Sequence, residues 1–373
     1  MSKTFKNKFF DYTYAHILKP VFFRQDPEKV HDLMTWFGHQ LGKYKITRGI
    51  TGGLFNYQNP MLEQTVLGIK FKNPVGLAAG FDKDAQLTKI LPAVGFGFEE
   101  IGSITGERCE GNPKPRLWRL PKSKSLIVYY GLKNDGAEAI SKRLQGEKFA
   151  FPIGVSVAKT NCKETVETES GVADYVKAYK AFQNIGDYYT INISCPNAFG
   201  GQPFSDPQKL ERLLQEISKL PKTKPIFLKL PPDISRDQVD AIISLAEKYG
   251  IDGFVCTNLT KDRDLLSLKE KIKDDLPTDK GGLSGKVVES LADEMIKYIY
   301  KKTGKKFVII GVGGIFNAED AYRKIRLGAS LVQLITGMIF EGPQLIGEIN
   351  RGLVELLQKD GFKNISEAIG LDV

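Results

Sequence analysis

The stretch INISCPN (191–197) places a thiol between two amides, just after an apolar run that predicts a buried strand. A cysteine acts as a general base near neutral pH when its pKa is depressed, and otherwise as a nucleophile or a metal ligand. Asn192, Asn197 and Asn258 each offer a hydrogen-bond donor and an acceptor. Three amides around Cys195 suit the edge of a planar ring that alternates N–H and C=O groups. The alternative is a small buried cysteine, which is the commoner fate of this residue.

Two lysines stand in segments that are otherwise apolar or rich in glycine: Lys229 in FLKLPPD and Lys83 in AAGFDKD. A buried lysine is costly unless it is paired. Lys229 therefore suggests a fixed cation beside a ring that gains negative charge on reduction, and Lys83 a cation for a planar anionic substrate. The alternative for both is a side chain that reaches out of the barrel to water.

The other thiols and the imidazoles carry less chemistry. Cys256 is expected to be a structural core residue, whereas Cys109 and Cys162 have no convergent partners in the sequence. The spacing of cysteines and histidines predicts neither a disulfide framework nor a metal site, and a reducing cytoplasm fits the cysteine use. The three histidines are all expected on N-terminal helices, away from the strand ends: His16, His31 and His39.

Hydrophobic periodicity predicts a (β/α)8 TIM barrel. Eight apolar runs of the strand type recur along the chain, at 73–80, 97–105, 151–159, 188–195, 225–232, 251–258, 307–315 and 330–337. Helical patterns separate most of them, at 205–220, 235–250, 287–304 and 317–328. A doubly wound open sheet is the alternative, but it usually has fewer strands and other glycine positions.

Glycines after the last two runs suggest a phosphate site. Gly313 and Gly314 follow the seventh run, and Thr336 and Gly337 follow the eighth, before a short helix. The loops after strands seven and eight are the usual phosphate site of this fold, and GGLSG (281–285) offers a third backbone contact. Plain turn glycines are the alternative. Two long inserts, 106–130 and 259–280, are expected to be lids or binding loops.

Residues 1–45 are predicted to form a small helical extension, and 46–373 the barrel. Asp26, Pro27 and Glu28 mark a helix start. The first 50 residues carry a net charge of +5, out of +9 for the whole chain. Such a basic, aromatic segment suits anionic lipid, although a plain solvated surface explains the charge as well. No apolar stretch is long enough for a membrane-spanning helix, and no secretory signal is expected.

Taken together, these motifs resemble the dihydroorotate dehydrogenase family. The resemblance rests on DPEKVH, NPVGLAAGFDKD, GFEEIGSIT, NISCPN, LKLPPD, GGLSG, IIGVGGI and GASLVQLITGMIF, and it spans about residues 10–355. The N-terminal extension and GGLSG are similar to the membrane-associated, quinone-reducing class 2 enzymes. The resemblance implies FMN as cofactor, dihydroorotate and orotate as substrate and product, and a quinone that arrives between the N-terminal helices. It implies no nucleic-acid partner and a peripheral place on the cytoplasmic side of the cell membrane.

The resemblance also implies roles for individual residues. Cys195 is the expected catalytic base, which takes a proton from carbon five of dihydroorotate. The residues expected at FMN are Ala79, Gly80, Ser103, Ser156, Asn192, Lys229, Thr257, Gly285, Gly314, Thr336 and Gly337. Those expected at the substrate are Lys83, Asn134, Asn192, Asn197 and Asn258.

The chain departs from the family pattern at several of these positions. Class 2 enzymes carry serine as the base, whereas a cysteine is the class 1 choice. An orotate-binding asparagine aligns with Val128, an asparagine near FMN with Ser156, and a threonine with Leu259. Three alternatives therefore stay open: a related FMN barrel for another pyrimidine or another acceptor such as fumarate or NAD, an enzyme similar to tRNA-dihydrouridine synthases, and a flavin-binding scaffold without catalysis. The chain ends soon after the eighth helix, which argues against the RNA-binding domain of the tRNA enzymes.

Overall fold

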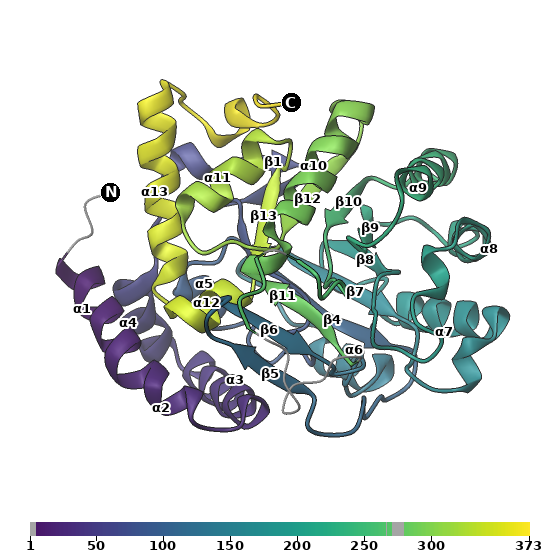
Figure 1. The fold of residues 1–373 in the computed structure, drawn as a ribbon, viewed down its shortest axis with the longest axis horizontal. Helices are drawn as coiled ribbons and strands as arrows, with labels where there is room; N and C mark the ends of the chain where they lie inside the picture. The colour runs from purple at the N-terminus through teal and green to yellow at the C-terminus, as the bar shows by residue number, and fades with distance from the viewer. Residues whose placement is uncertain (1–4, 266, 271–279) are drawn as a thin grey trace.

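A closed barrel of eight parallel strands forms the centre of the molecule (Figure 1). The computed structural model describes residues 5–265, 267–270 and 280–373. The barrel strands are β3 (Val75–Leu77), β4 (Phe98–Thr105), β7 (Ile153–Ala158), β8 (Tyr188–Asn192), β9 (Ile226–Leu230), β10 (Gly253–Cys256), β12 (Val308–Val312) and β13 (Leu331–Leu334). Each lies within one of the eight apolar runs, so the TIM barrel predicted from the sequence is confirmed.

Helices surround the barrel. They are α5 (Leu91–Val94), α6 (Ala137–Leu144), α7 (Thr168–Ala181), α8 (Pro207–Ser218), α9 (Arg236–Lys248), α10 (Glu289–Thr303), α11 (Ala318–Arg326), α12 (Thr336–Glu341) and α13 (Leu345–Asp360). Side chains cap several of them as the sequence suggests. Asp206 accepts from Lys209 N at 3.1 Å at the start of α8, and Ser235 forms a capping box with Gln238 at the start of α9. These caps fix where the helices begin after each loop.

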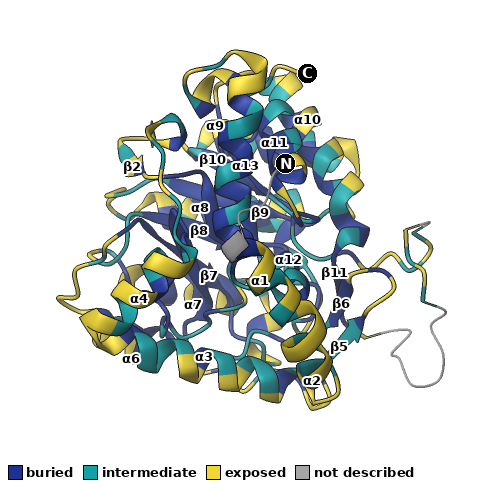
Figure 2. Cartoon of the chain, turned by 90° about the vertical axis from the view of Figure 1, so that its left-hand side faces the viewer, coloured by how far each residue is buried: buried dark blue, intermediate teal, exposed yellow. Residues whose placement is uncertain are grey.

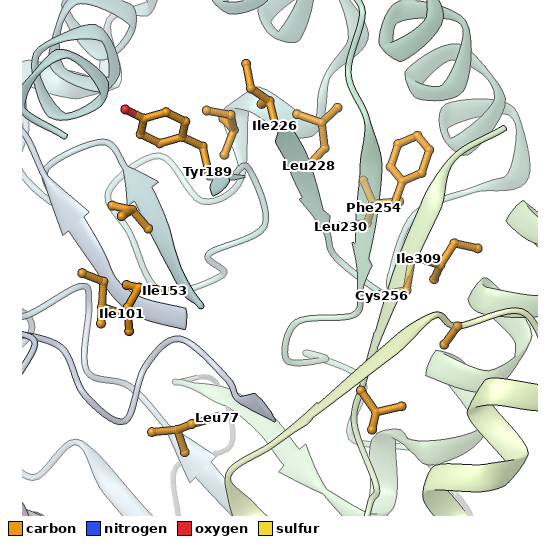
Figure 3. Close-up of a cluster of buried hydrophobic side chains, with 14 of the residues drawn as sticks. Leu77, Ile101, Ile153, Tyr189, Ile226, Leu228, Leu230, Phe254, Cys256 and Ile309 are labelled. Carbon is orange, nitrogen blue, oxygen red and sulfur yellow. The ribbon is translucent and has the colours of Figure 1, made fainter. Parts of the chain in front are cut away.

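Alternation along the strands divides the side chains into an outer and an inner set. Leu228 and Leu230 of β9 belong to the large core between barrel and helices, together with Phe254 of β10 and Ile101 of β4 (Figure 3). Phe227, between the outward positions of β9, packs with other inward residues in a separate cluster inside the barrel. Because the period of a strand is two, Lys229 also points inward.

The inside of the barrel is filled in layers. A short antiparallel hairpin, β1 (Gln64–Val66) with β2 (Ile69–Phe71), closes one end by packing Phe71 against Phe98, whose ring centroid is 5.3 Å away. Above that aromatic layer Glu100 accepts from Thr190 Oγ1 at 2.9 Å and from Gln333 Nε2 at 3.1 Å. The layers are a packed core rather than a pore, and they support the strand ends from below.

The first insert folds into a small sheet instead of a loop. Strands β5 (Leu117–Leu120) and β6 (Ser125–Val128) pair antiparallel, and β11 (Gly282–Gly285) pairs with β6. The GGLSG segment is therefore largely a strand, a state that its glycine content did not suggest. Of the second expected insert, 259–280, residues 266 and 271–279 lie outside the described residues.

The N-terminal segment is more helical than the sequence indicated. It contains α1 (Phe5–Thr13), a π-helical turn (Tyr14–Leu18), α2 (Lys19–Phe23), α3 (Pro27–Lys43) and α4 (Lys45–Phe55). Asp26 caps α3 by accepting from Lys29 N at 2.9 Å, as expected. Helix α4 was missed, because it lies almost wholly beyond the predicted extension 1–45. Tyr14 Oη donates to Ile339 O at 2.7 Å, which anchors the segment to the barrel.

Many residues of these helices are exposed (Figure 2), and large apolar residues are among them. The most exposed are Phe9, Tyr12, Ile17, Val21, Trp36, Phe37, Tyr44, Ile46 and Ile50. Within the part of the chain that the structure describes, no helix has the length and apolar character to cross a bilayer.

Candidate active site

One cavity at the carboxyl ends of the strands collects almost all of the predicted site residues. It encloses about 1260 Å³ of empty space, part of which is open to solvent. The expected cofactor residues that line it are Ala79, Gly80, Ser103, Asn192, Lys229, Thr257, Gly285, Gly314, Thr336 and Gly337. Of the expected catalytic and substrate residues, Cys195, Lys83, Asn197 and Asn258 line it too. A closed parallel barrel brings them together because all of its strand ends meet at one face.

Cys195 lies three residues past the end of β8, and its side chain is half-buried at the cavity wall. Burial raises the pKa of this thiol, while the backbone N–H of Asn197 and the charge of Lys159 lower the pKa by smaller amounts. The depressed pKa that the simplest base mechanism requires is therefore not built into the free protein. The thiol needs positive charge close by to become a thiolate.

Lys229 is a buried cation that faces the cavity from β9. It has no hydrogen bond or ion pair with any residue that the structure describes, and burial lowers its pKa. Among charged groups, Glu100 has the largest effect on the pKa of Lys229 and raises it. The Glu100 carboxylate accepts hydrogen bonds from Thr190 and Gln333. A desolvated ammonium without a direct partner is costly, so its place at the cavity wall favours a ligand that carries negative charge.

Lys83 is the second cation of the cavity, and it is half-buried. Its ammonium lies 4.0 Å from the ring centroid of Tyr130, and burial lowers its pKa to about 8. His31 Nε2 lies 3.3 Å from Lys83 Nζ and 2.8 Å from Phe81 O. The expectation that every histidine lies away from the strand ends is therefore wrong for His31, because α3 packs directly over the loop after β3. His39 also reaches that loop, at Gln86 O.

The side-chain amides of Asn192, Asn197 and Asn258 already form hydrogen bonds with neighbouring loops. Asn192 donates to Ser103 Oγ at 2.7 Å and accepts from Ser194 Oγ at 2.9 Å. Asn258 donates to Ser194 O at 2.9 Å, so it ties the loop after β10 to the loop after β8. Asn197 donates to Val128 O at 2.7 Å. The three amides thus fix the loops around Cys195 and retain only part of their capacity for a ring.

Ser156 and Asn134 do not line the cavity. Ser156 lies one layer behind it, with its Oγ 2.8 Å from Ser103 Oγ. Asn134 accepts from Gly136 N at 2.8 Å and donates to Thr105 Oγ1 at 2.8 Å and to Leu132 O at 2.7 Å. Its amide is saturated by the groups around its own loop. Both residues reach a ligand only through the neighbours that they hold.

At the glycine-rich end of the cavity, neighbouring atoms pack so closely against the backbone that a side chain would not fit. Gly314 has φ +75°, and a Cβ there would stand 2.4 Å from Cβ of Glu289. Gly337 would place a Cβ 2.0 Å from Ile315 O. Thr336 begins α12, whose first N–H groups have no partner within the helix. A side chain therefore does not fit at Gly314 or Gly337, and the first N–H groups of α12 are donors of the kind that an anion site uses.

Lys159 is a functional candidate that the sequence analysis missed. It follows β7 directly, only 3% of it is exposed, and it lies beside Cys195 in a small second cavity behind the thiol. The rule that singled out the other strand ends would have found it, because Lys159 is the last residue of the run 151–159. Its position at the end of an otherwise apolar segment is the same signal as for Lys229.

Comparisons with known proteins show which family the chain resembles. The family model described as "Dihydroorotate dehydrogenase" matches residues 61–357. A protein named dihydroorotate dehydrogenase (quinone) from Nitratiruptor sp. is 40% identical over 95% of this chain and 98% of its own. Its counterpart from Trichodesmium erythraeum is 36% identical over 96% of this chain and 98% of its own.

Solved structures give the same result. The ligand-free dihydroorotate dehydrogenase of Eimeria tenella superposes with a TM-score of 0.80 at 30% identity, covering 93% of this chain and 99% of its own. The complex of the Eimeria tenella enzyme with ferulenol also has a TM-score of 0.80, at 29% identity, and covers 93% of this chain and 96% of its own.

The fold and the cavity define an enzyme of the (β/α)8 class, with its site at the carboxyl ends of the strands. Within that class, the chain belongs to the dihydroorotate dehydrogenase family, as the matched family model and its curated relatives show.

Proposed function

We propose that the protein is an FMN-dependent dihydroorotate dehydrogenase that oxidises (S)-dihydroorotate to orotate in pyrimidine biosynthesis and uses a quinone as electron acceptor. The observation that carries the proposal is the position of Cys195. Its thiol shares one cavity with the buried Lys229, the half-buried Lys83 and a glycine-rich end suited to an anion, in a chain of this family.

The residues present fit FMN. Lys229 is a buried cation whose charge is not neutralised by any described ion pair, and it faces the cavity. At the glycine-rich end of the cavity, a side chain does not fit at Gly314 or Gly337, so the backbone there is open to a phosphate. These two features match a flavin mononucleotide, whose phosphate is an anion and whose ring gains negative charge on reduction.

Named residues would hold each part of the cofactor. Lys229, Asn192 and Ser103 would bind the ring, while Gly285, Gly314, Thr336 and Gly337 would surround the phosphate. Ala79, Gly80 and Thr257 would complete the walls, and Ser156 would position Ser103 through the contact at 2.8 Å. When bound, FMN supplies the acceptor for the hydride that leaves carbon six of the substrate.

The substrate would lie between the thiol and the amides. Lys83 would bind the carboxylate, and Asn192, Asn197 and Asn258 would contact the ring, with Asn134 shaping the loop before them. Cys195 Sγ would accept the proton from carbon five, so that a double bond forms between carbons five and six. The two amides on either side of the thiol hold its loop in place for that transfer.

The apolar side of the same cavity suits the quinone. It is lined by His31 from α3, by Leu117, Leu126 and Tyr130 of the small sheet and its flanking loop, and by Phe316 and Ile339. Residues 1–45 would then form the quinone entrance, and 46–373 the FMN-binding barrel. The exposed aromatic and aliphatic residues of α1 to α4, in a basic segment, support peripheral attachment to the cytoplasmic face of the cell membrane.

Replacement of the thiol tests the proposal. We expect Cys195→Ala, loaded with FMN, to be reduced by dihydroorotate about 10²- to 10⁴-fold more slowly than the wild type in anaerobic stopped-flow measurements. Cys256→Ala is the matched control, because that thiol is buried on the outer face of β10 and should leave the rate unchanged. Equal rates for Cys195→Ala and the wild type would contradict the role of the thiol as base.

A further inference from the structure

A buried ammonium stands directly behind the candidate base. Lys159 and Cys195 both line the small cavity on the protein side of the thiol, together with Tyr175 and Phe204. Lys159 comes from the end of β7 and Cys195 from the loop after β8, and these strands are neighbours in the barrel. The thiol therefore has the substrate cavity on one side and Lys159 on the other.

The position of Lys159 is fixed by two hydrogen bonds. Its Nζ donates to Phe199 O at 3.0 Å and to Thr165 Oγ1 at 3.4 Å. Phe199 belongs to the same loop as Cys195, four residues further on, so the ammonium ties the loop that carries the thiol to the end of β7. Burial lowers the pKa of Lys159, and the carbonyl and the hydroxyl that accept from its ammonium carry no negative charge to compensate it.

No carboxylate among the described residues lies within ion-pair distance of Lys159. The acidic residue that acts on it most is Asp174 of α7, and the oxygens of Asp174 are already occupied. They accept from Gly106 N at 3.1 Å, from Thr160 N at 2.6 Å and from Thr160 Oγ1 at 2.9 Å. An ammonium without a carboxylate in a buried place is costly, which points to another anion.

Among the acidic groups that act on Lys159, Cys195 is the one that also lines the substrate cavity. The other ionisable groups that act on the two residues are Cys109, Cys162, Asp174, Tyr175, Lys229 and Lys261. Cys162 acts on Lys159 more strongly than Cys195 does, but its thiol donates to Thr165 Oγ1 and does not line the substrate cavity. Burial raises the pKa of both Cys109 and Tyr175. Lys229 belongs to the cofactor wall, and Lys261 is exposed and screened by water.

We propose that Lys159 is the positioning residue for Cys195, a fixed cation that stabilises the thiolate and holds its loop. This inference rests on the proposed role of Cys195 as the base. Lys159 lowers the pKa of Cys195 against the larger effect of burial, so its loss should make the thiolate rarer still. Lys159 does not touch the substrate; it acts only through the sulfur and through the loop 195–201.

The test is the titration of the thiol itself. The rate of alkylation of Cys195 by iodoacetamide is followed against pH in the FMN-loaded protein, and the labelled peptide is identified by mass spectrometry. We expect Lys159→Met to raise the apparent pKa of Cys195 by about one unit or more, since it removes an opposite charge close to the thiol. Lys159→Arg keeps the charge and should restore most of the wild-type value.

Lys261→Met is the matched control, since it removes an exposed lysine that acts on the same thiol. We expect no shift for this variant. An unchanged titration in Lys159→Met, or the same shift in Lys159→Met and Lys159→Arg, would overturn the proposal. In the second case the effect would come from packing and not from charge.

A second measurement separates this inference from the proposed function. The pH dependence of flavin reduction by dihydroorotate should shift in Lys159→Met by the same amount as the thiol titration. A shifted thiol with an unshifted reduction profile would support the cation at Cys195 while rejecting Cys195 as the base. Flavin absorbance of each variant, which reports the loaded fold, should match that of the wild type.

Discussion

Cys195 is surrounded by opposing influences on its charge. The protein buries the sulfur, which raises its pKa, and places Lys159 and the backbone N–H of Asn197 where they lower it. A general base works best when its pKa lies near the working pH. The balance found here favours a base that becomes active on the alkaline side of neutrality.

This balance predicts a pH profile. Because burial holds the pKa of Cys195 above its ordinary value, the thiolate fraction is small at neutral pH and grows as the pH rises. We expect the rate of flavin reduction at saturating dihydroorotate to increase steadily with pH through the neutral range. The rate is measured by anaerobic stopped-flow spectroscopy, with Cys195→Ser as the comparison, which should lack the same titration. A plateau that is already complete below neutral pH would contradict the expectation.

Among single residues, those at strand ends were predictable from the sequence. Cys195, Lys229 and Asn192 were found because each interrupts or ends an apolar run, and the barrel turns them into the cavity. Lys159 satisfies the same rule and was overlooked. His31 could not be found in this way, because its place over the strand ends depends on how α3 packs.

The element that joins the N-terminal helices to the site is held by a buried ion pair. Glu28, in the first turn of α3, accepts from Arg116 Nη2 at 2.8 Å and from Arg116 Nε at 3.0 Å. Arg116 directly precedes β5, and the two side chains are only 4% and 5% exposed. Arg116 also donates to Glu110 O and Asn112 O, which fixes the first insert.

Breaking that pair should destabilise the protein. We expect Glu28→Gln to lower the free energy of unfolding by about 3–5 kcal/mol, because the guanidinium of Arg116 is left buried without its carboxylate. Urea denaturation at neutral pH measures the change. Lys114→Ala is the control: Lys114 is an exposed partner of the same carboxylate, at 3.4 Å, and its loss should cost about 1 kcal/mol or less.

The ion pair of Glu28 and Arg116 also determines how the stability of the protein changes with pH. Burial would raise the pKa of Glu28, but hydrogen bonding and charge from Arg116, helped by Lys114, outweigh it, so its pKa is lowered in the folded protein. The stabilisation is therefore present above the unfolded pKa of a glutamate and is lost as the pH falls through the folded value. A Glu28→Gln variant as stable as the wild type near pH 7 would contradict this account.

Strands and helices were predictable from the sequence where their hydrophobic pattern is unbroken. Buried parallel strands read as unbroken apolar runs, so all eight were recognised. Strands β5, β6 and β11 were missed because they are short, antiparallel and set among lysines, prolines and glycines. Helix α4 was missed because Gly49, Gly52 and Gly53 lower its propensity.

The molecule as a whole presents one unusual surface. Exposed large apolar residues concentrate on α1 to α4, and the rest of the described chain shows few of them. His31 of α3 lines the apolar side of the cavity. A basic segment with exposed aromatic and aliphatic side chains is typical of proteins that bind the membrane surface. The position of this surface beside the cavity is a property of the assembled chain, which no single motif predicts.

Introducing negative charge on the exposed face of α4 should weaken membrane binding. Ile46 is 77% exposed and Ile50 is 60% exposed, so their replacement by glutamate leaves the core intact. We expect the double variant Ile46→Glu with Ile50→Glu to bind phosphatidylglycerol vesicles about tenfold more weakly, or worse, in a sedimentation assay. Val166→Glu, at an exposed residue of the loop before α7, is the control and should bind as the wild type does. Equal binding by both variants would count against attachment through these helices.

The central claim, a flavin over the barrel mouth that dihydroorotate reduces, has one direct test. Purified protein is loaded with FMN and titrated anaerobically with dihydroorotate while its visible absorbance is recorded, after which ubiquinone, menaquinone, fumarate and NAD are added in turn. The account predicts a yellow protein that bleaches with dihydroorotate and regains its colour with a quinone. Protein that stays colourless after incubation with FMN, or that binds FMN and does not bleach with dihydroorotate, would contradict it.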